Sequence, residues 1–446
     1  MKKVDSLLHA RWIVPVEPAG VVLEHHSLAI EDGRITGLLP TPEAKRRFEA
    51  AVNVDLSDHA LLPGFVNAHT HAAMTLLRGL GGDVPLMQWL QEHIWPAEGR
   101  HVGREFVRDG TQLAMAEMLR GGTTCFQDMY FFPDEVARAA AQAGLRATVG
   151  LIVFDFPSAW GSGPDDYLHK GMELHDELRG HPLVSTAFAP HAPYTVSDAP
   201  LERIAMYAEE LDLPVHMHVH ETAFEVETAQ AQAGRRPLAR LKELGLVTPR
   251  LMAVHMTQLT EAEIEGHAAA GAHVVHCPES NLKLASGFCP VQRLLGAGVN
   301  VALGTDGAAS NNDLDMLGEM RTAALLGKAV AGDASAVSAE TALRMATLNG
   351  ARALGLDGIT GSLVPGKAAD VTAVNLRGLE TEPVYNVITQ LVYSTGRERV
   401  TDVWVAGRHL LKERQLTTLD EEAILARARQ WRARIQHSDV SPEEKP

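Results

Sequence analysis

Cysteine is scarce in this chain, and long apolar runs are missing. The three cysteines (Cys125, Cys277 and Cys289) are odd in number and lack the spacing of a metal site, which argues against a disulfide framework and fits a reducing cytoplasm. No run of about 18 apolar residues occurs, so no membrane span is expected. The N-terminus has neither a long apolar core nor a small-residue cleavage site, so no signal peptide is expected.

Positive charge is also in deficit. The 40 lysines and arginines face 56 acidic residues, which gives a net charge of -16. A chain this acidic repels phosphate backbones, so nucleic acid is excluded as a partner, whereas a pocket for a nucleoside is not. The 446 residues, 46% of them hydrophobic, suit one large domain and a smaller one. Disorder is expected only in the last residues, 436–446.

Short β-branched runs alternate with helical stretches from residue 61 to about 307. Eight such runs occur, at residues 61–71, 122–129, 146–155, 183–191, 214–221, 251–256, 273–280 and 300–307. Strands that alternate with helices indicate a parallel sheet, and eight units over about 250 residues predict an α/β fold, a closed (β/α)₈ TIM barrel. A doubly wound open sheet is the alternative.

Both ends of the chain contain short strand-like pieces, with a hairpin signal at EDGR, residues 31–34. We expect the two ends to build one small flanking β-sandwich domain together. The predicted division is residues 1–60 and 361–415 for that domain, 61–360 for the barrel, and 416–446 for a final helix and tail. Helices are predicted at 197–212, 338–356 and 419–436 from apolar residues at steps of three and four.

Titratable residues stand at the same end of strand after strand, the end that carries the active site of such a barrel. They are His69, His71, His191, His216, His218, His220, Glu221, His255, His276, Glu279 and Asp306. A lone histidine would more often be a core or surface residue, but agreement among six strand ends favours a shared site.

Imidazole nitrogens and carboxylate oxygens are ligands of zinc. His69 and His71 are two residues apart and can face one side of a strand; a solvated strand end is the alternative. With Asp306 and one histidine of the fifth run they would suffice for one ion. His216, His218 and His220 share the same parity, so spacing leaves that choice open. A bound ion would acidify water, Asp306 and Glu221 could move protons, and His255 could orient the water, which predicts metal-assisted hydrolysis.

The stretches PGFVNAHTH, HMHVHET, AVHMTQLT and GTDGAASNNDLDM together resemble the amidohydrolase superfamily. More narrowly, they are similar to the 5'-methylthioadenosine/S-adenosylhomocysteine deaminases and their chlorohydrolase-like relatives, over nearly the whole chain. The resemblance implies metal ligands at His69, His71, His218 and Asp306. It also implies that Glu221 protonates the purine ring, that Asp306 accepts the proton of water, and that His255 holds the attacking hydroxide.

The resemblance further implies a single divalent metal, because the end of the fourth strand, where residues 183–194 read LVSTAFAPHAPY, lacks the lysine that bridges two metals in other members. Zinc is expected, and iron or manganese would also suit these ligands. Glu98, His191 and Ser310 match positions that face substrate, with Glu98 at the ribose hydroxyls. Trp89 belongs either to the pocket or to the core. Asn281 and Lys283 are expected to support the site, and a homo-oligomer is implied.

One departure bears on the substrate. Relatives that act on S-adenosylhomocysteine present an arginine between the third and fourth strands, where this chain has Phe154, Phe156 and Trp160 and no arginine before Arg179. An aromatic lining favours 5'-methylthioadenosine over a charged tail, unless a neighbouring subunit supplies the arginine. S-adenosylhomocysteine and adenosine remain further substrates to test. The alternatives are a hydrolase of guanine, cytosine or triazine rings and a non-catalytic scaffold.

Overall fold

The structure is a computed structural model that describes residues 1–438. Disorder is expected at residues 436–446, of which 439–446 lie outside the described residues. Residues 436–438 belong to the last turn of helix α17 (Glu421–Ser438).

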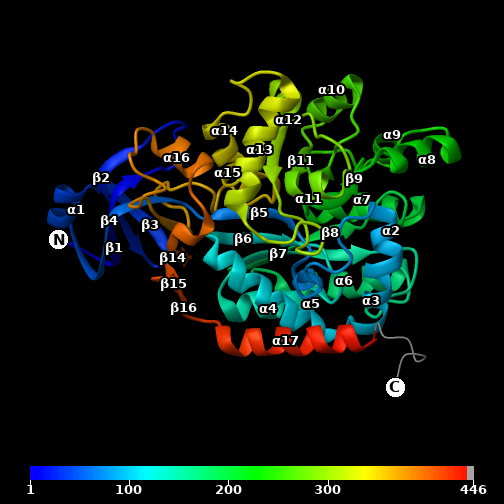
Figure 1. Cartoon of the computed structure of the whole chain (residues 1–446), viewed down its shortest axis with the longest axis horizontal. Helices are drawn as coiled ribbons and strands as arrows, with labels where there is room; N and C mark the ends of the chain where they lie inside the picture. Colours follow the sequence, from blue (N-terminus) through cyan, green and yellow to red (C-terminus); the bar gives the residue numbers. More distant parts are fainter. Residues whose placement is uncertain (439–446) are drawn as a thin grey trace.

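Eight parallel strands form the barrel in sequence order (Figure 1). They are β5 (Phe65–Thr70), β6 (Thr123–Asp128), β7 (Arg146–Val153), β8 (Val184–Pro190), β9 (Val215–Val219), β10 (Leu251–His255), β11 (His273–His276) and β12 (Asn300–Leu303). Every predicted run contains one of these strands. The first and last strands approach each other, because the Asp306 amide donates to the His69 carbonyl at 3.0 Å and the Asn67 amide donates to the Thr305 hydroxyl at 2.7 Å. This closure confirms the barrel over the open sheet.

Helices surround the barrel and follow its strands. They are η1 (Ala72–Leu77), α2 (Leu86–Trp89), η2 (Leu90–Ile94), α3 (Trp95–His101), α4 (Arg104–Arg120), α5 (Pro133–Ala143), α6 (Pro164–Leu178), α7 (Asp198–Leu211), α8 (Ala223–Ala233), α9 (Pro237–Glu243), α10 (Glu261–Ala269), α11 (Pro278–Lys283), α12 (Val291–Gly296) and α13 (Met316–Ala331). Strands β5, β6 and β7 are buried at every residue, since helices cover them outside and side chains fill the interior.

Strands from both chain ends form a second, mixed sheet beside the barrel, as predicted (Figure 1). They are β1 (Lys2–Ile13), β2 (Leu23–Glu31), β3 (Arg34–Pro40), β4 (Phe48–Pro63), β13 (Val371–Asn375), β14 (Val400–Val405), β15 (Arg408–Lys412) and β16 (Gln415–Leu416). The sheet curls over its own apolar core, because Ile35 of β3 donates its amide to the Lys367 carbonyl at 2.9 Å, close to the start of β13. The EDGR turn is confirmed, with Asp32 at φ 49° and Gly33 at φ 74°.

The prediction of one continuous helix at residues 338–356 is wrong. The segment forms two helices, α14 (Ala339–Met345) and α15 (Leu348–Ala353), separated at Thr347 with φ -131° and ψ -93°. The Thr347 side chain donates to the Leu343 carbonyl at 2.6 Å, so the turn is held where the periodicity predicts a continuous helix. Short helices α1 (Thr41–Arg47), α16 (Val387–Tyr393) and η3 (Arg397–Arg399) complete the flank.

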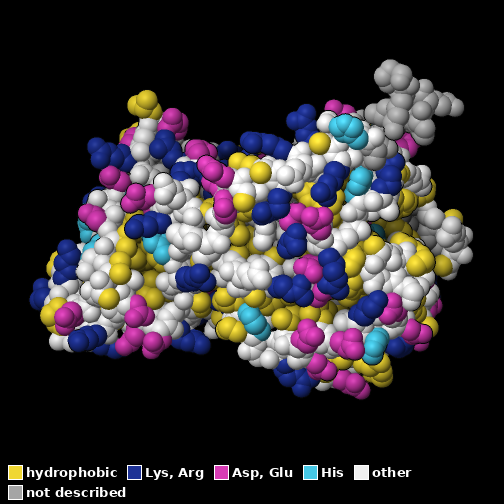
Figure 2. Space-filling model, turned by 90° about the horizontal axis from the view of Figure 1, so that it is seen from below, with side chains coloured by type: hydrophobic (Ala, Val, Ile, Leu, Met, Phe, Trp, Pro, Cys, Tyr) yellow, Lys and Arg dark blue, Asp and Glu magenta, His cyan; other side chains and the backbone are white. Residues whose placement is uncertain are grey.

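Helix α17 lies along α4 beneath the barrel (Figure 1). Its Trp431 packs edge-to-face on Phe106 and donates to Asp109 of α4 at 3.0 Å, which confirms the predicted amphipathic helix. On the face seen from below, acidic and basic side chains are interspersed with apolar ones (Figure 2). No helix among residues 1–438 is long and apolar enough to cross a membrane.

One buried ion pair joins the barrel to the flanking sheet. Arg146 opens β7 and donates two hydrogen bonds to Asp370, from Nε at 2.8 Å and from Nη2 at 3.2 Å, while both side chains are almost inaccessible to solvent. Asp370 also accepts the Ala406 amide at 2.7 Å. The pair therefore fixes the flank against the amino-terminal end of the barrel strands.

Replacing Arg146 with methionine is expected to cost about 3–5 kcal/mol of stability, because Asp370 would keep a buried charge without its partner. The measurement is the calorimetric melting temperature, which should fall by several degrees. Arg179→Met is the control, since the exposed Arg179–Asp176 pair should contribute at most about 1 kcal/mol. Equal melting temperatures for the two variants would contradict the role of the buried pair.

Candidate metal centre and active site

The carboxyl ends of the barrel strands bring the predicted residues together. His69 lies in β5 and His71 one residue beyond it, while Asp306 lies three residues after β12. Asp306 (φ 61°) and His255 (φ 74°) adopt the left-handed conformation that non-glycine residues rarely use. Such backbone strain persists where surrounding contacts fix it, and it clusters at functional sites.

Three imidazole nitrogens and one carboxylate oxygen converge at the centre of this face. Asp306 Oδ1 lies 3.2 Å from His69 Nε2 and 3.2 Å from His71 Nε2. His218 Nε2 lies 3.3 Å from His69 Nε2. Potential ligand atoms of His69, His71 and Asp306, and of His69, His218 and His255, lie within 4.8 Å of one another.

The hydrogen bonds of the outer ring nitrogens fit a metal at this point. His71 Nδ1 donates to the Met129 carbonyl at 2.6 Å, and His218 Nδ1 donates to the His191 carbonyl at 2.8 Å. His69 Nδ1 bonds His216 Nε2 at 2.7 Å. A carbonyl can only accept, so the Nε2 atoms of neutral His71 and His218 carry lone pairs aimed inward, as ligands require.

The three histidines of β9 and its end separate in space, although spacing alone left the choice open. His218 faces the convergence point, and His216 lies behind His69. His220 lies beyond the strand at φ 53° and accepts the Leu238 amide at 3.1 Å, directed away from the site. The strand ends at Val219, so the alternation no longer applies at His220.

Burial and the Asp306 charge set the protonation of these ligands. Burial lowers the pKa of His218 well below its usual range and that of His69 to about 4, so both are neutral at pH 7. Burial also lowers the pKa of His71, but its contacts with Asp306 outweigh that effect and raise the pKa to about 9. Without an ion, His71 therefore holds a proton that a metal must displace.

Two serine hydroxyls fix the other oxygen of Asp306. Ser280 and Ser310 donate to Oδ2 at 2.6 and 2.8 Å. Oδ1 accepts the Gly307 amide at 2.8 Å and faces His69 and His71. Sequence reasoning placed Ser310 near the site but missed Ser280, although Ser280 follows directly after Glu279 at the end of the seventh run. Glu279 itself accepts from Thr322 at 2.8 Å and does not line the cavity above this centre.

Glu221 and His255 face each other beside the candidate metal ligands. His255 Nε2 lies 3.8 Å from Glu221 Oε2. On the other side of the same ring, His255 Nδ1 donates to Asn281 Oδ1 at 2.8 Å. Burial raises the pKa of Glu221, which favours the protonated acid. Asn281, expected to support the site, thus contacts His255, and Lys283 donates to the Ala309 carbonyl in the loop after Asp306 at 3.0 Å.

A cavity of about 640 Å³ opens above this centre. Trp89, Glu98, His191 and Ser310 all line it, together with His71, His218, Glu221, His255 and Asp306. Trp89 is buried and donates its ring N–H to the Leu80 carbonyl at 2.9 Å, so it serves core and pocket at once. Glu98 accepts the Tyr130 hydroxyl at 2.6 Å, and desolvation raises its pKa to about 7. Tyr130, which directly follows the second run, was missed by sequence reasoning.

Residues 60–410 match the model of the amidohydrolase family. The chain belongs to the amidohydrolase family. This membership agrees with the resemblance seen in the motifs, and members of the family depend on metal ions.

Other family members are similar over nearly their full length. A 5-methylthioadenosine/S-adenosylhomocysteine deaminase of Saccharophagus degradans is 54% identical, covering 98% of each chain. The enzyme of the same name from Teredinibacter turnerae is 53% identical over 97% of this chain and 98% of its own. The crystal structure of an adenosine deaminase from Xanthomonas campestris with bound zinc has a TM-score of 0.97 and 58% identity, over 98% of this chain and 99% of that one.

Metal binding by this amidohydrolase is expected to strengthen with pH. Because the pKa of His71 is about 9 without an ion, each ion displaces about one proton below that pH. Apparent zinc affinity should therefore rise about tenfold per pH unit between pH 6 and 8, measured by chelator competition on the apoprotein. A zinc affinity that does not change between pH 6 and 8, after correction for the pH dependence of the chelator, would contradict the assignment of His71.

Proposed function

We propose that this chain catalyses the hydrolytic deamination of 5'-methylthioadenosine to 5'-methylthioinosine and ammonia. The observation that carries the proposal is the composition of one cavity. It combines the convergent His69, His71, His218 and Asp306 with the acid Glu221 and with an apolar, aromatic wall. The names of the bacterial relatives and of the zinc-bound neighbour support the same substrate class.

His69, His71, His218 and Asp306 would hold one divalent ion, with zinc the best match to three imidazoles and a carboxylate. When bound, the ion supplies water acidified toward neutral pH. His255 orients that water by its inward Nε2. Asp306 accepts a proton from the water through Oδ1, the oxygen that faces His69 and His71, as the water adds to the amino-bearing ring carbon. Glu221 gives its proton to the adjacent ring nitrogen, and Asp306 passes its own to the departing ammonia. The proton that remains on the added hydroxyl returns to Glu221 as the ring carbonyl forms, which restores the acid.

Glu98 stands at the part of the cavity that would receive the sugar. Its carboxyl group is held by Tyr130, so a fixed acceptor is available for the ribose hydroxyls. A bare base could not use this contact, which favours a nucleoside over guanine or cytosine. The triazine hydrolase and guanine deaminase structures that share this fold are only 23% and 20% identical, so that likeness concerns the fold alone.

The cavity wall favours a methylthio tail over a charged one. Phe131, Phe154 and Phe156 line it, and Phe154 packs at 4.8–5.6 Å from the other two rings. Within the described part of the chain, no lysine or arginine lines the cavity. A homocysteine carboxylate would lose water there without gaining a cation from this chain. We also propose that the protein is a cytoplasmic homo-oligomer. Its domains would be the flanking domain at residues 1–60 and 361–415, the barrel at 61–360, and the final helix and tail at 416–446.

The substrate test is a panel assay of ammonia release by the zinc-loaded protein. The expected order of kcat/KM places 5'-methylthioadenosine above S-adenosylhomocysteine and adenosine, with adenine and guanine lowest. A higher value for S-adenosylhomocysteine would overturn the preference and indicate a cation from another subunit. Release from none of the nucleosides would overturn the proposed function.

A substitution in the wall sharpens the same test. Ala159 lines the cavity and is exposed to it, so Ala159→Arg should place a cation near the tail. The ratio of kcat/KM for S-adenosylhomocysteine to that for 5'-methylthioadenosine should rise about tenfold, in keeping with one charge-assisted contact. Ala159→Gln, which adds length without charge, is the control and should leave the ratio nearly unchanged.

The proton donor is tested separately. Glu221→Gln keeps the shape of the side chain but removes its acidic proton, so kcat for 5'-methylthioadenosine should fall about 10²–10⁴-fold while zinc content stays at one per chain. Glu227→Gln is the matched control, because Glu227 is exposed on neighbouring α8. Activity of Glu221→Gln close to that of the control would rule out the assigned role.

A further inference from the structure

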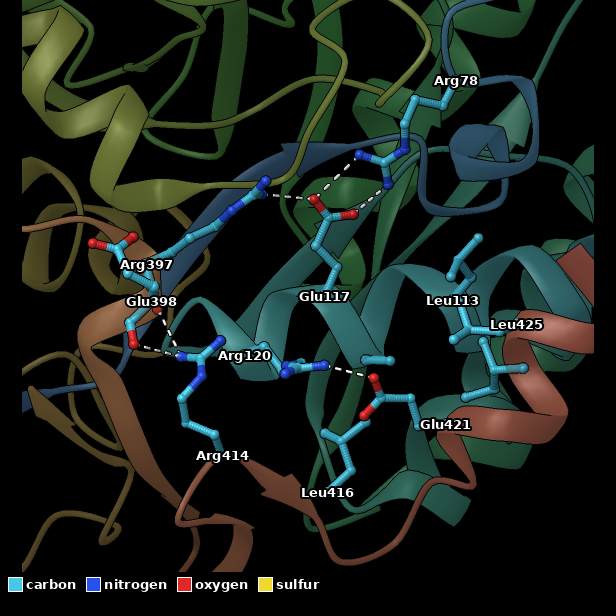
Figure 3. Close-up of a pocket in the computed structure, with 12 residues that line it drawn as sticks. Arg78, Leu113, Glu117, Arg120, Arg397, Glu398, Arg414, Leu416, Glu421 and Leu425 are labelled. Carbon is cyan, nitrogen blue, oxygen red and sulfur yellow. Dashed lines mark hydrogen bonds and ion pairs between the residues drawn. The ribbon is translucent and has the colours of Figure 1, made fainter.

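A second cavity, of about 400 Å³, lies between α4, α17 and the flanking strands (Figure 3). It shares no lining residue with the substrate cavity. Its most connected side chain is Glu117 of α4, a largely buried carboxylate that is 17% exposed. The proposed reaction gives this residue no part, so its contacts call for another explanation.

The Glu117 carboxylate accepts hydrogen bonds from three separate segments. Arg78 donates to both oxygens, to Oε1 at 3.2 Å and to Oε2 in a shorter contact. Arg397 of the flanking domain donates to Oε1 at 2.9 Å, and the Leu314 amide donates to the same atom at 3.3 Å. Figure 3 shows the guanidinium groups of Arg78 and Arg397 reaching this carboxylate from different sides.

Two of these segments carry the metal ligands. Arg78 follows η1, the short helix that begins directly after His71. Leu314 belongs to the loop that leaves β12 and contains Asp306 and Ser310. Arg78 also donates to the Asn312 carbonyl of that loop at 2.6 Å, so the two segments are tied to each other as well as to Glu117.

Helix α4 supports η1 at a second point. The α4 backbone at Gly110 lies directly against η1, where a Cβ atom would be 2.5 Å from the Ala73 carbonyl oxygen. Gly110 thus fixes the start of η1 and Glu117 fixes the residue after its end. Both contacts come from one rigid helix.

From these contacts we infer that Glu117 is a positioning residue of the metal centre. It sets the distance between the loop that carries His71 and the loop that carries Asp306, and Arg397 extends this support to the flanking domain. The carboxylate does not touch substrate or metal. A small shift between ligand loops is sufficient to lower catalysis strongly, because reacting groups must be held within a fraction of an ångström.

The test compares two variants on the same helix. Glu117→Gln keeps the volume but removes the charge that gathers two guanidinium groups. Arg120→Met is the control. Arg120 lines the same cavity, but its side chain pairs with Glu421 and not with Glu117. Zinc affinity is measured by chelator competition, and kcat and KM are measured with 5'-methylthioadenosine. The kinetic arm rests on the proposed function, whereas the zinc arm does not.

For Glu117→Gln we expect zinc affinity and kcat each to fall about tenfold, with KM within about twofold, and for Arg120→Met we expect both to stay near the parent values. A lower melting temperature with unchanged zinc affinity would overturn the inference, because Glu117 would then be structural only. If Glu117→Gln does not fold, Arg397→Met takes its place. A smaller loss of zinc affinity in Arg397→Met supports the inference, whereas an unchanged zinc affinity overturns it. Inactivity of the parent protein would count against the proposed function, and the zinc arm would still decide this inference.

Discussion

The closure of the barrel and the assembly of the candidate metal centre depend on the same contact. The Asp306 amide bonds the His69 carbonyl across the gap between the last and first strands, and the two side chains then meet at 3.2 Å. Residues 237 positions apart in the chain are therefore brought together by main-chain geometry. A change that opened the barrel between β12 and β5 would therefore also separate Asp306 from His69.

Electrostatics in the centre follow from burial. An imidazole removed from water loses its affinity for protons, which leaves His69 and His218 neutral and ready to bind a cation. The same burial raises the pKa of Glu221, so one low-dielectric environment prepares both ligands and an acid. The Asp306 carboxylate instead raises the pKa of His71 to about 9, so a metal bound there would compete with a proton.

The flanking domain shares an apolar core with the barrel, and charged side chains join the two at further points. Arg146 and Asp370 fix it at the amino-terminal end of the strands. Arg397 extends from it toward α4 and reaches Glu117, beside the loops that leave the carboxyl ends. The second contact connects the flanking domain to Glu117, whose other oxygen contacts reach Arg78 and the Leu314 amide beside the candidate site.

The sequence alone determined the alternation of strands and helices, the strand-like pieces at both ends of the chain, and the strand ends at which titratable residues gather. These features are local or periodic, so they can be read from residue order. The tertiary structure decided what depends on distant contacts or on single dihedral angles. Parity could not separate His216, His218 and His220, because the strand ends before His220 and its backbone turns away. The helix break at Thr347 and the roles of Ser280, Tyr130 and Glu117 likewise arise from partners far apart in the chain, which residue spacing does not record.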